Sequence, residues 1–190
     1  MIFGSPDKFA IYLDVVDEWS EFPVYVNGLV ALYIKGVRIF GDIYSLSIFD
    51  NVSGITKGAL RHTRFVDEGF FNQSSVFLIQ NLMKNRHPAH VFYSVEEFAE
   101  YPDHVYEMED VSFDANFDAL EHYEYKLFVM SYAQLTRILC VKFASNAMGF
   151  FNLTDLKEED VLDLVLPTEE LYNIVQSVEK WYSGLEALPT

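Results

Sequence analysis

Cysteine is almost absent from this sequence of 190 residues. The single Cys140 excludes an internal disulfide. It lies in the apolar run Ile138-Leu139-Cys140-Val141, where we expect a small buried side chain. No cysteine pair is available for a zinc site either.

Long apolar runs are also missing. No run approaches the roughly 18 apolar residues of a membrane-spanning helix. The opening residues, MIFGSPDKF, lack the basic segment and the apolar segment of a signal peptide. We therefore expect a cytoplasmic protein.

The motifs of common enzymes are absent as well. The sequence contains no GxGxxG, GxxxxGK[ST], GxSxG or HExxH pattern. His87-Pro88-Ala89-His90 places two histidines three apart, but the proline breaks the helix that would align them. The stretch from Asp114 to Asp118 lacks the glycine and the terminal glutamate of a calcium loop. We expect no catalytic residues, no metal and no cofactor.

Basic residues are scarce: 13 Lys and Arg stand against 29 Asp and Glu, for a net charge of −16. Such a charge disfavours nucleic acid and anionic membranes as direct ligands. The excess is confined to one half. Residues 1–93 contain nine acids and eight bases, whereas residues 94–190 contain twenty acids and five bases. This asymmetry is typical of an interaction surface, although solubility alone would also explain it.

The densest negative charge lies in residues 94–124, which we call the acidic segment. It contains eleven carboxylates, no Lys or Arg, and six interleaved aromatic residues. Because aromatic side chains supply apolar surface for folding, this segment differs from a solvated acidic tail. We predict a docking face for a basic partner, and its candidate contacts are Glu96, Glu97, Glu100, Tyr101, Asp103, Tyr106, Glu107, Glu109, Asp110, Asp114 and Asp118.

Two alternatives accompany this prediction. Tyr101 and Tyr106 have the amphipathic character of interface residues, but they would equally pin the segment to a sheet. His104 and His122 lie among carboxylates, which is also the composition of an acid–base site. With so many acids in one segment, chance explains that proximity.

Apolar periodicity predicts several elements. In the first half we expect a strand over 9–15, a hairpin of 28–34 and 37–40 around Lys35-Gly36, a turn or helix start at 51–54, a short helix over 55–62, and a helix over 76–84 capped by Ser74 or Ser75. Trp19, Trp181 and most phenylalanines are expected in the core.

In the second half we expect a strand at 91–93, a short helix over 94–100, mostly loop over 103–119, strands over 123–132, 137–144 and 161–166, and a C-terminal helix from Thr168 with an apolar stripe. This order lacks βαβ alternation. It predicts an α+β fold with a mostly antiparallel sheet, a few helices packed on it and an amphipathic C-terminal helix. We expect one domain over residues 1–190.

The N-terminal residues carry a family resemblance. The opening Met1-Ile2-Phe3-Gly4-Ser5-Pro6-Asp7-Lys8-Phe9-Ala10-Ile11, then Glu18-Trp19-Ser20, Asn27-Gly28-Leu29 and Ile34-Lys35-Gly36, resemble the bacterial immunity protein 42 family. These are the antitoxin partners of contact-dependent inhibition and other polymorphic toxin systems. The resemblance implies that the chain binds one cognate toxin domain, often a basic nuclease, in the cytosol and blocks it. It supplies no catalytic or contact residues.

The sequence therefore leaves three hypotheses about function. The first is an immunity protein that neutralises a toxin through the acidic segment. The second is a non-catalytic acidic adaptor or structural protein. The third is an enzyme that uses His104 or His122 with nearby carboxylates.

Overall fold

The computed structural model describes residues 1–21, 25–39, 46–86, 111–115, 117–142, 153 and 155–186, which form two sheets. The N-terminal sheet contains β1 (Ile2–Gly4), β2 (Phe9–Val15), β3 (Asn27–Ile34), β4 (Val37–Arg38) and β5 (Leu46–Ser47). The C-terminal sheet contains β6 (Arg64–Phe65), β7 (Tyr125–Tyr132), β8 (Leu135–Lys142) and β9 (Val161–Pro167). Among these strands, every pairing is antiparallel except that of β6 with β7. The α+β prediction is confirmed.

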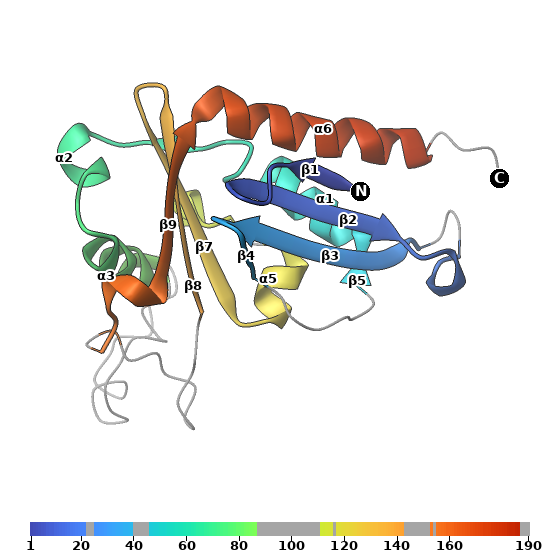
Figure 1. Cartoon of the computed structure of the whole chain (residues 1–190), viewed down its shortest axis with the longest axis horizontal. Helices are drawn as coiled ribbons and strands as arrows, with labels where there is room; N and C mark the ends of the chain where they lie inside the picture. Colours follow the sequence, from blue (N-terminus) through green and yellow to red (C-terminus); the bar gives the residue numbers. More distant parts are fainter. Residues whose placement is uncertain are drawn as a thin grey trace.

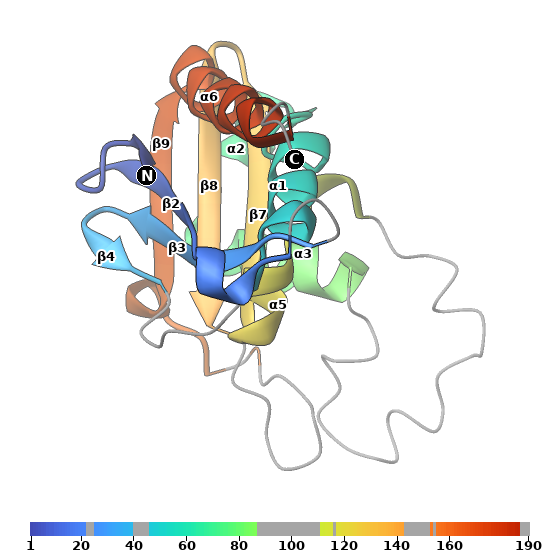
Figure 2. The same cartoon turned by 90° about the vertical axis from the view of Figure 1, so that its right-hand side faces the viewer.

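Helices pack against both sheets. They are α1 (Ile48–Lys57), α2 (Glu68–Phe71), α3 (Ser75–Arg86), α5 (Asp118–His122) and α6 (Thr168–Glu186), with 3-10 turns η1 (Asp17–Trp19), η4 (Val111–Phe113) and η5 (Glu158–Asp160). Figure 1 shows α6 lying along the edge of the N-terminal sheet beside β1, and α2 and α3 on the far side of the C-terminal sheet. Figure 2 shows the N-terminal sheet crossing in front of β7, β8 and β9.

Two apolar clusters follow from this layering. The larger one joins residues of both sheets with α1 and α6, including Ile11, Leu32, Ile138 and Val175. The smaller one packs α3 on the opposite face of the C-terminal sheet. Strand β8 is covered on both faces, and this is why six consecutive residues, 136–141, are buried.

Of the two hairpin turns predicted from the sequence, the structure confirms the first and shortens the second. Lys35 (φ 54°) and Gly36 (φ 80°) both adopt positive φ, as the predicted two-residue turn requires. The turn between β7 and β8 is also two residues, with Ala133 at φ 51°. Strand β8 therefore begins at Leu135, and the longer predicted connection over 133–136 is wrong.

The region around α1 corrects two predictions, the turn or helix start at 51–54 and the short helix over 55–62. The hydroxyl of Ser47 accepts from the backbone N–H of Asp50 at 3.2 Å, so the helix starts at Ile48 and ends at Lys57. Gly54 lies inside it rather than in a turn. The burial of Ile48, Val52 and Ile55 offsets the cost of that glycine. The helix predicted from Ser74 or Ser75 is confirmed as α3, with Ser74 accepting from Phe77 at 3.2 Å.

The two tryptophans differ in environment. Trp181 on α6 is partly buried and packs against Phe3 in a tilted arrangement, with ring centroids 5.7 Å apart. Trp19 in η1 is 39% exposed, so its predicted place in the core is wrong. Cys140 is buried as expected, and burial raises the pKa of its thiol to about 12.

Candidate functional site

Most of the predicted docking face lies outside the described residues. Glu96, Glu97, Glu100, Tyr101, Asp103, Tyr106, Glu107, Glu109 and Asp110 all fall within residues 87–110, as do His87, His90 and His104. The predicted strand at 91–93 and helix over 94–100 fall there too. The predicted contacts that the structure does place are Asp114 and Asp118.

These two aspartates occupy different environments. Asp114 is 9% exposed and forms a β-bridge to Phe128 of β7. Asp118 is the first residue of α5 and is exposed. The structure therefore turns one carboxylate inward and presents the other to solvent.

A buried amide fixes the position of Asp118. Asn51 on α1 is fully buried, and its Oδ1 accepts from the backbone N–H of Ala119 at 2.8 Å. Its Nδ2 donates to the carbonyl of Ser47 at 2.7 Å. Ala119 and Leu120, which belong to α5 itself, are buried on its inner side. The first turn of α5 is thus tied to α1, with Asp118 on its outer side.

The candidate acid–base histidine lies on the surface. His122 is exposed at the end of α5, where its ring meets Tyr123 edge-on at 5.1 Å. Across the residues with described positions, no group of three His, Cys, Asp or Glu side chains is arranged to hold a metal ion. The structure brings His122 into no such group within that part of the chain.

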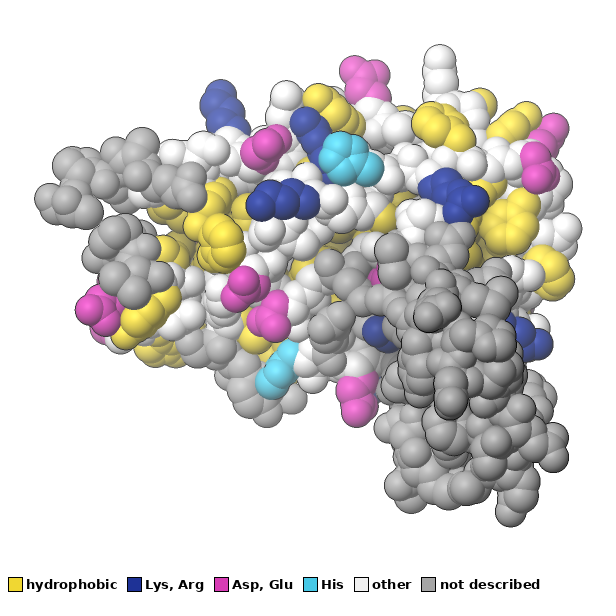
Figure 3. All heavy atoms as spheres, turned by 180° about the vertical axis from the view of Figure 1, so that it is seen from behind, with side chains coloured by type: hydrophobic (Ala, Val, Ile, Leu, Met, Phe, Trp, Pro, Cys, Tyr) yellow, Lys and Arg dark blue, Asp and Glu magenta, His cyan; other side chains and the backbone are white. Residues whose placement is uncertain are grey.

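The surface seen from behind mixes both signs of charge. In Figure 3, Lys and Arg side chains are interspersed with Asp and Glu over the described part of this face. Exposed apolar side chains lie between them in this view. The described residues of this face form no continuous acidic field.

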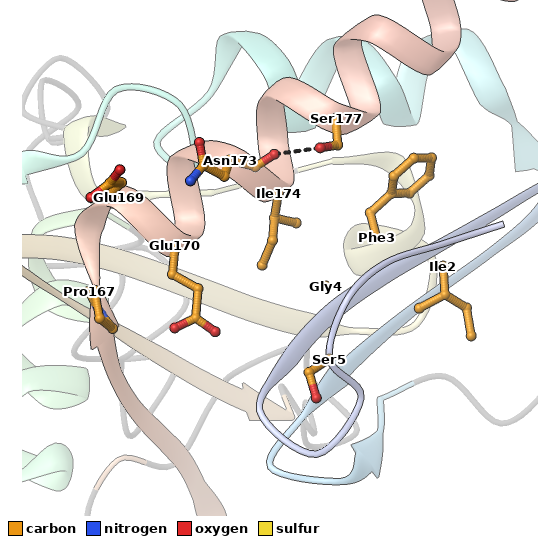
Figure 4. A pocket seen from close by; sticks show the side chains of 10 residues that line it. All are labelled: Ile2, Phe3, Gly4, Ser5, Pro167, Glu169, Glu170, Asn173, Ile174 and Ser177. Atoms are coloured by element: carbon orange, nitrogen blue, oxygen red, sulfur yellow. Dashed lines mark hydrogen bonds between the residues drawn. The ribbon is translucent and has the colours of Figure 1, made fainter.

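A concave surface that the sequence did not indicate lies between β1 and α6. It is an open cleft of about 690 Å³. Its walls are residues 2–5 on one side and the N-terminal half of α6 on the other, shown in Figure 4. Sequence reasoning missed it because Ile2, Asn173 and their neighbours form no motif, and only the packing of the two chain ends brings them together.

Comparison with known proteins adds the family to these observations. The family model of immunity protein 42 matches residues 1–181, so the chain belongs to that family. It is an immunity protein that neutralises a cognate toxin, and as a member of this family it is not an enzyme. The adaptor and enzyme alternatives are set aside on this ground.

A solved structure shows the same fold. The chain is similar to CdiI from Burkholderia dolosa AUO158, with a TM-score of 0.66 and 20% identity over 95% of this chain and 99% of that one. No curated protein matches. Among the described helices, none is long and apolar enough to cross a membrane.

Proposed function

We infer that the cognate toxin is a basic domain at the C-terminus of a larger protein. In this proposal the immunity protein binds it in the cytoplasm through the acidic segment. The observation that carries the proposal is the charge distribution: residues 94–190 hold twenty acids against five bases. A basic nuclease domain is the partner that such a distribution suits best, because opposite charges steer the two proteins together.

Charge and aromatic area have separate roles in this proposal. Carboxylates at the rim of an interface mainly accelerate association and make it sensitive to salt. Tyrosines contribute the desolvated centre, where most binding energy is concentrated. Tyr101 and Tyr106 are the proposed central contacts, with Glu96, Glu97, Glu100 and Asp103 around them.

The described aspartates refine the proposed contact set. Asp118 is exposed and held in place by the Asn51 bond to Ala119. It therefore meets the requirement of a direct contact. Asp114 is nearly buried beside β7. Its burial favours a supporting role inside the fold over contact with the toxin.

The first test is charge reversal within the acidic segment. We expect the variant with Glu96, Glu97, Glu100 and Asp103 all replaced by lysine to associate with the toxin domain encoded beside this chain roughly 10- to 100-fold more slowly at low salt. Stopped-flow kinetics at several salt concentrations measures the association rate.

A matched variant separates position from total charge. Replacing Asp7, Asp17, Glu18 and Glu21 by lysine makes the same change in net charge in the N-terminal half, where all four are exposed. We expect a much smaller effect from this variant. Equal slowing by both sets would show that only total charge matters, and unchanged rates would reject the acidic segment as the docking face.

A further inference from the structure

The cleft between β1 and α6 has an apolar floor and an acceptor-rich rim. Ile174 is 7% exposed and Phe3 is also 7% exposed, and both lie at its base. Glu169, Glu170, Asn173 and Ser177 line it from α6. Figure 4 shows the side chains of α6 on one wall and the backbone of β1 on the other. Its volume of about 690 Å³ is in the range of sites that hold a ligand or a short peptide.

Glycine at position 4 allows β1 to approach α6 this closely. Gly4 has φ +97°, which favours glycine, and a Cβ added there would lie 2.8 Å from Cδ1 of Ile174 and 2.3 Å from the carbonyl oxygen of Phe9. The backbone itself therefore forms part of the cleft wall, where a side chain would otherwise fill the space.

The outer edge of β1 is available for hydrogen bonding. Leu13 donates to the carbonyl of Met1, and Ser5 donates to the carbonyl of Phe9, so the odd residues of this stretch bond to β2. In an antiparallel ladder the residues between them point their backbone groups the other way. The N–H and C=O of Ile2 and the N–H of Gly4 thus face the cleft side, with no partner among the residues that the structure describes.

The charge of the cleft selects the ligand. Two glutamates and no Lys or Arg belong to its lining. Among the residues with described positions, Lys8 is the one cation that the Glu170 carboxylate contacts, at 3.4 Å, and the Lys8 side chain is 61% exposed. Such an exposed pair is weak and is readily exchanged for another cation.

We propose that this cleft binds a short extended segment of the toxin that carries a lysine or arginine. The segment pairs with the outer edge of β1, its aliphatic stem lies on Ile174, and its cation replaces Lys8 at Glu170. This inference rests on the proposed function, because the occupant is the toxin. It adds a second contact region, remote in sequence from the acidic segment.

The test compares two arginine substitutions on α6. Asn173 and Gln176 are both exposed, three residues apart, but only Asn173 lines the cleft. We expect Asn173→Arg to weaken the affinity for the toxin domain on the order of tenfold, by obstructing the cleft and adding a repelling charge. Gln176→Arg has the same charge change and should stay within about twofold of wild type. Both should unfold at the wild-type temperature.

A third variant tests the cation. Glu170→Gln keeps the size of the side chain, and we expect it to weaken binding several-fold and to reduce its salt dependence. Unchanged affinity in Asn173→Arg would overturn the cleft as a contact, while toxin binding by the wild type would leave the proposed function intact. If Asn173→Arg loses affinity for the toxin and Glu170→Gln does not, the cleft binds the toxin but no toxin lysine or arginine pairs with Glu170. Wild-type protein that binds no toxin would reject the proposed function itself.

Discussion

At the scale of single residues, Arg137 shows how one charged side chain joins several elements of the fold. It is 7% exposed and forms a bidentate pair with Asp163, with Nε to Oδ1 at 2.9 Å. Its Nη1 also donates to the carbonyls of Phe71 and Gln73. One guanidinium therefore ties β8 to β9 and to the loop that follows α2. A planar group with several fixed donors suits this role better than an ammonium.

Removing this side chain should destabilise the fold. We expect Arg137→Ala to lower the free energy of unfolding by about 2–4 kcal/mol, because two carbonyls and a half-buried carboxylate lose their donor. Arg137→Lys should recover only part of this loss. Urea denaturation measures both.

The control for that prediction is an exposed pair. Lys157 and Glu159 approach to 3.7 Å with side chains more than 70% exposed, and Lys157→Ala should cost less than about 0.5 kcal/mol. A similar loss in both variants would show that burial and the extra carbonyl bonds contribute nothing at Arg137.

Residue-scale inference from the sequence succeeds where local chemistry decides the outcome. Lys35-Gly36 between two apolar runs predicts a turn with positive φ, and the backbone alone enforces it. The prediction that Trp19 lies in the core is wrong. It rested on the large apolar area of tryptophan, which is normally buried. Here Trp19 is 39% exposed, and its neighbours Asp17, Glu18 and Glu21 are exposed as well. The acids flanking Trp19 were the available signal.

At the scale of elements, α5 depends on α1 for its position. The helix is only five residues long, too short to be stable by its own hydrogen bonds. Its backbone is anchored by the Asn51 amide at Ala119 and by the burial of Leu120. The place of Asp118 on the surface is therefore set by a residue 67 positions earlier in the chain.

Loss of that amide should loosen α5 selectively. We expect Asn51→Ala to cost about 2 kcal/mol and to accelerate hydrogen exchange at the Ala119 amide. Thr56→Ala is the matched control, because the Thr56 hydroxyl donates to the carbonyl of Val52 within α1, at 2.8 Å, and to no other residue in the described part of the chain. It should leave exchange at Ala119 unchanged. Equal protection of Ala119 in wild type and Asn51→Ala would contradict the proposed anchor.

Long elements were predictable and short ones were not. The apolar stripe of α6 over Leu171, Val175 and Val178 packs on the core as its spacing predicts. Strands β7, β8 and β9 also follow from their apolar runs. Strand β6 is two exposed residues paired in parallel with β7, and nothing in Arg64-Phe65 indicates a strand. Its existence depends on β7 supplying the partner.

At the scale of the whole molecule, the sequence indicated the class of fold without its arrangement. An alternation of apolar residues says which face of a strand is buried, but not which element covers it. The division into two crossed sheets with one shared core is a property of contacts distant in sequence. The single domain over residues 1–190 stays a prediction.

The candidate site shows the same limit. Composition indicated the acidic segment because eleven carboxylates lie close together in the sequence, within residues 94–124. The cleft is formed by residues 2–5 and 167–177, which meet only in the folded chain. If both regions contact the toxin, the interface combines a charged docking surface with a shaped pocket. Mutations in either region would then weaken toxin binding on their own.

The central claim is that this chain neutralises the toxin encoded beside it by forming a stoichiometric complex. The most direct measurement titrates the purified chain into that toxin domain while following its toxic activity and the molar mass of the complex. We expect activity to fall to background at one equivalent, with a 1:1 complex in solution, and an unrelated toxin to stay active. Full toxin activity at a several-fold excess of the chain, with no complex formed, would contradict the claim.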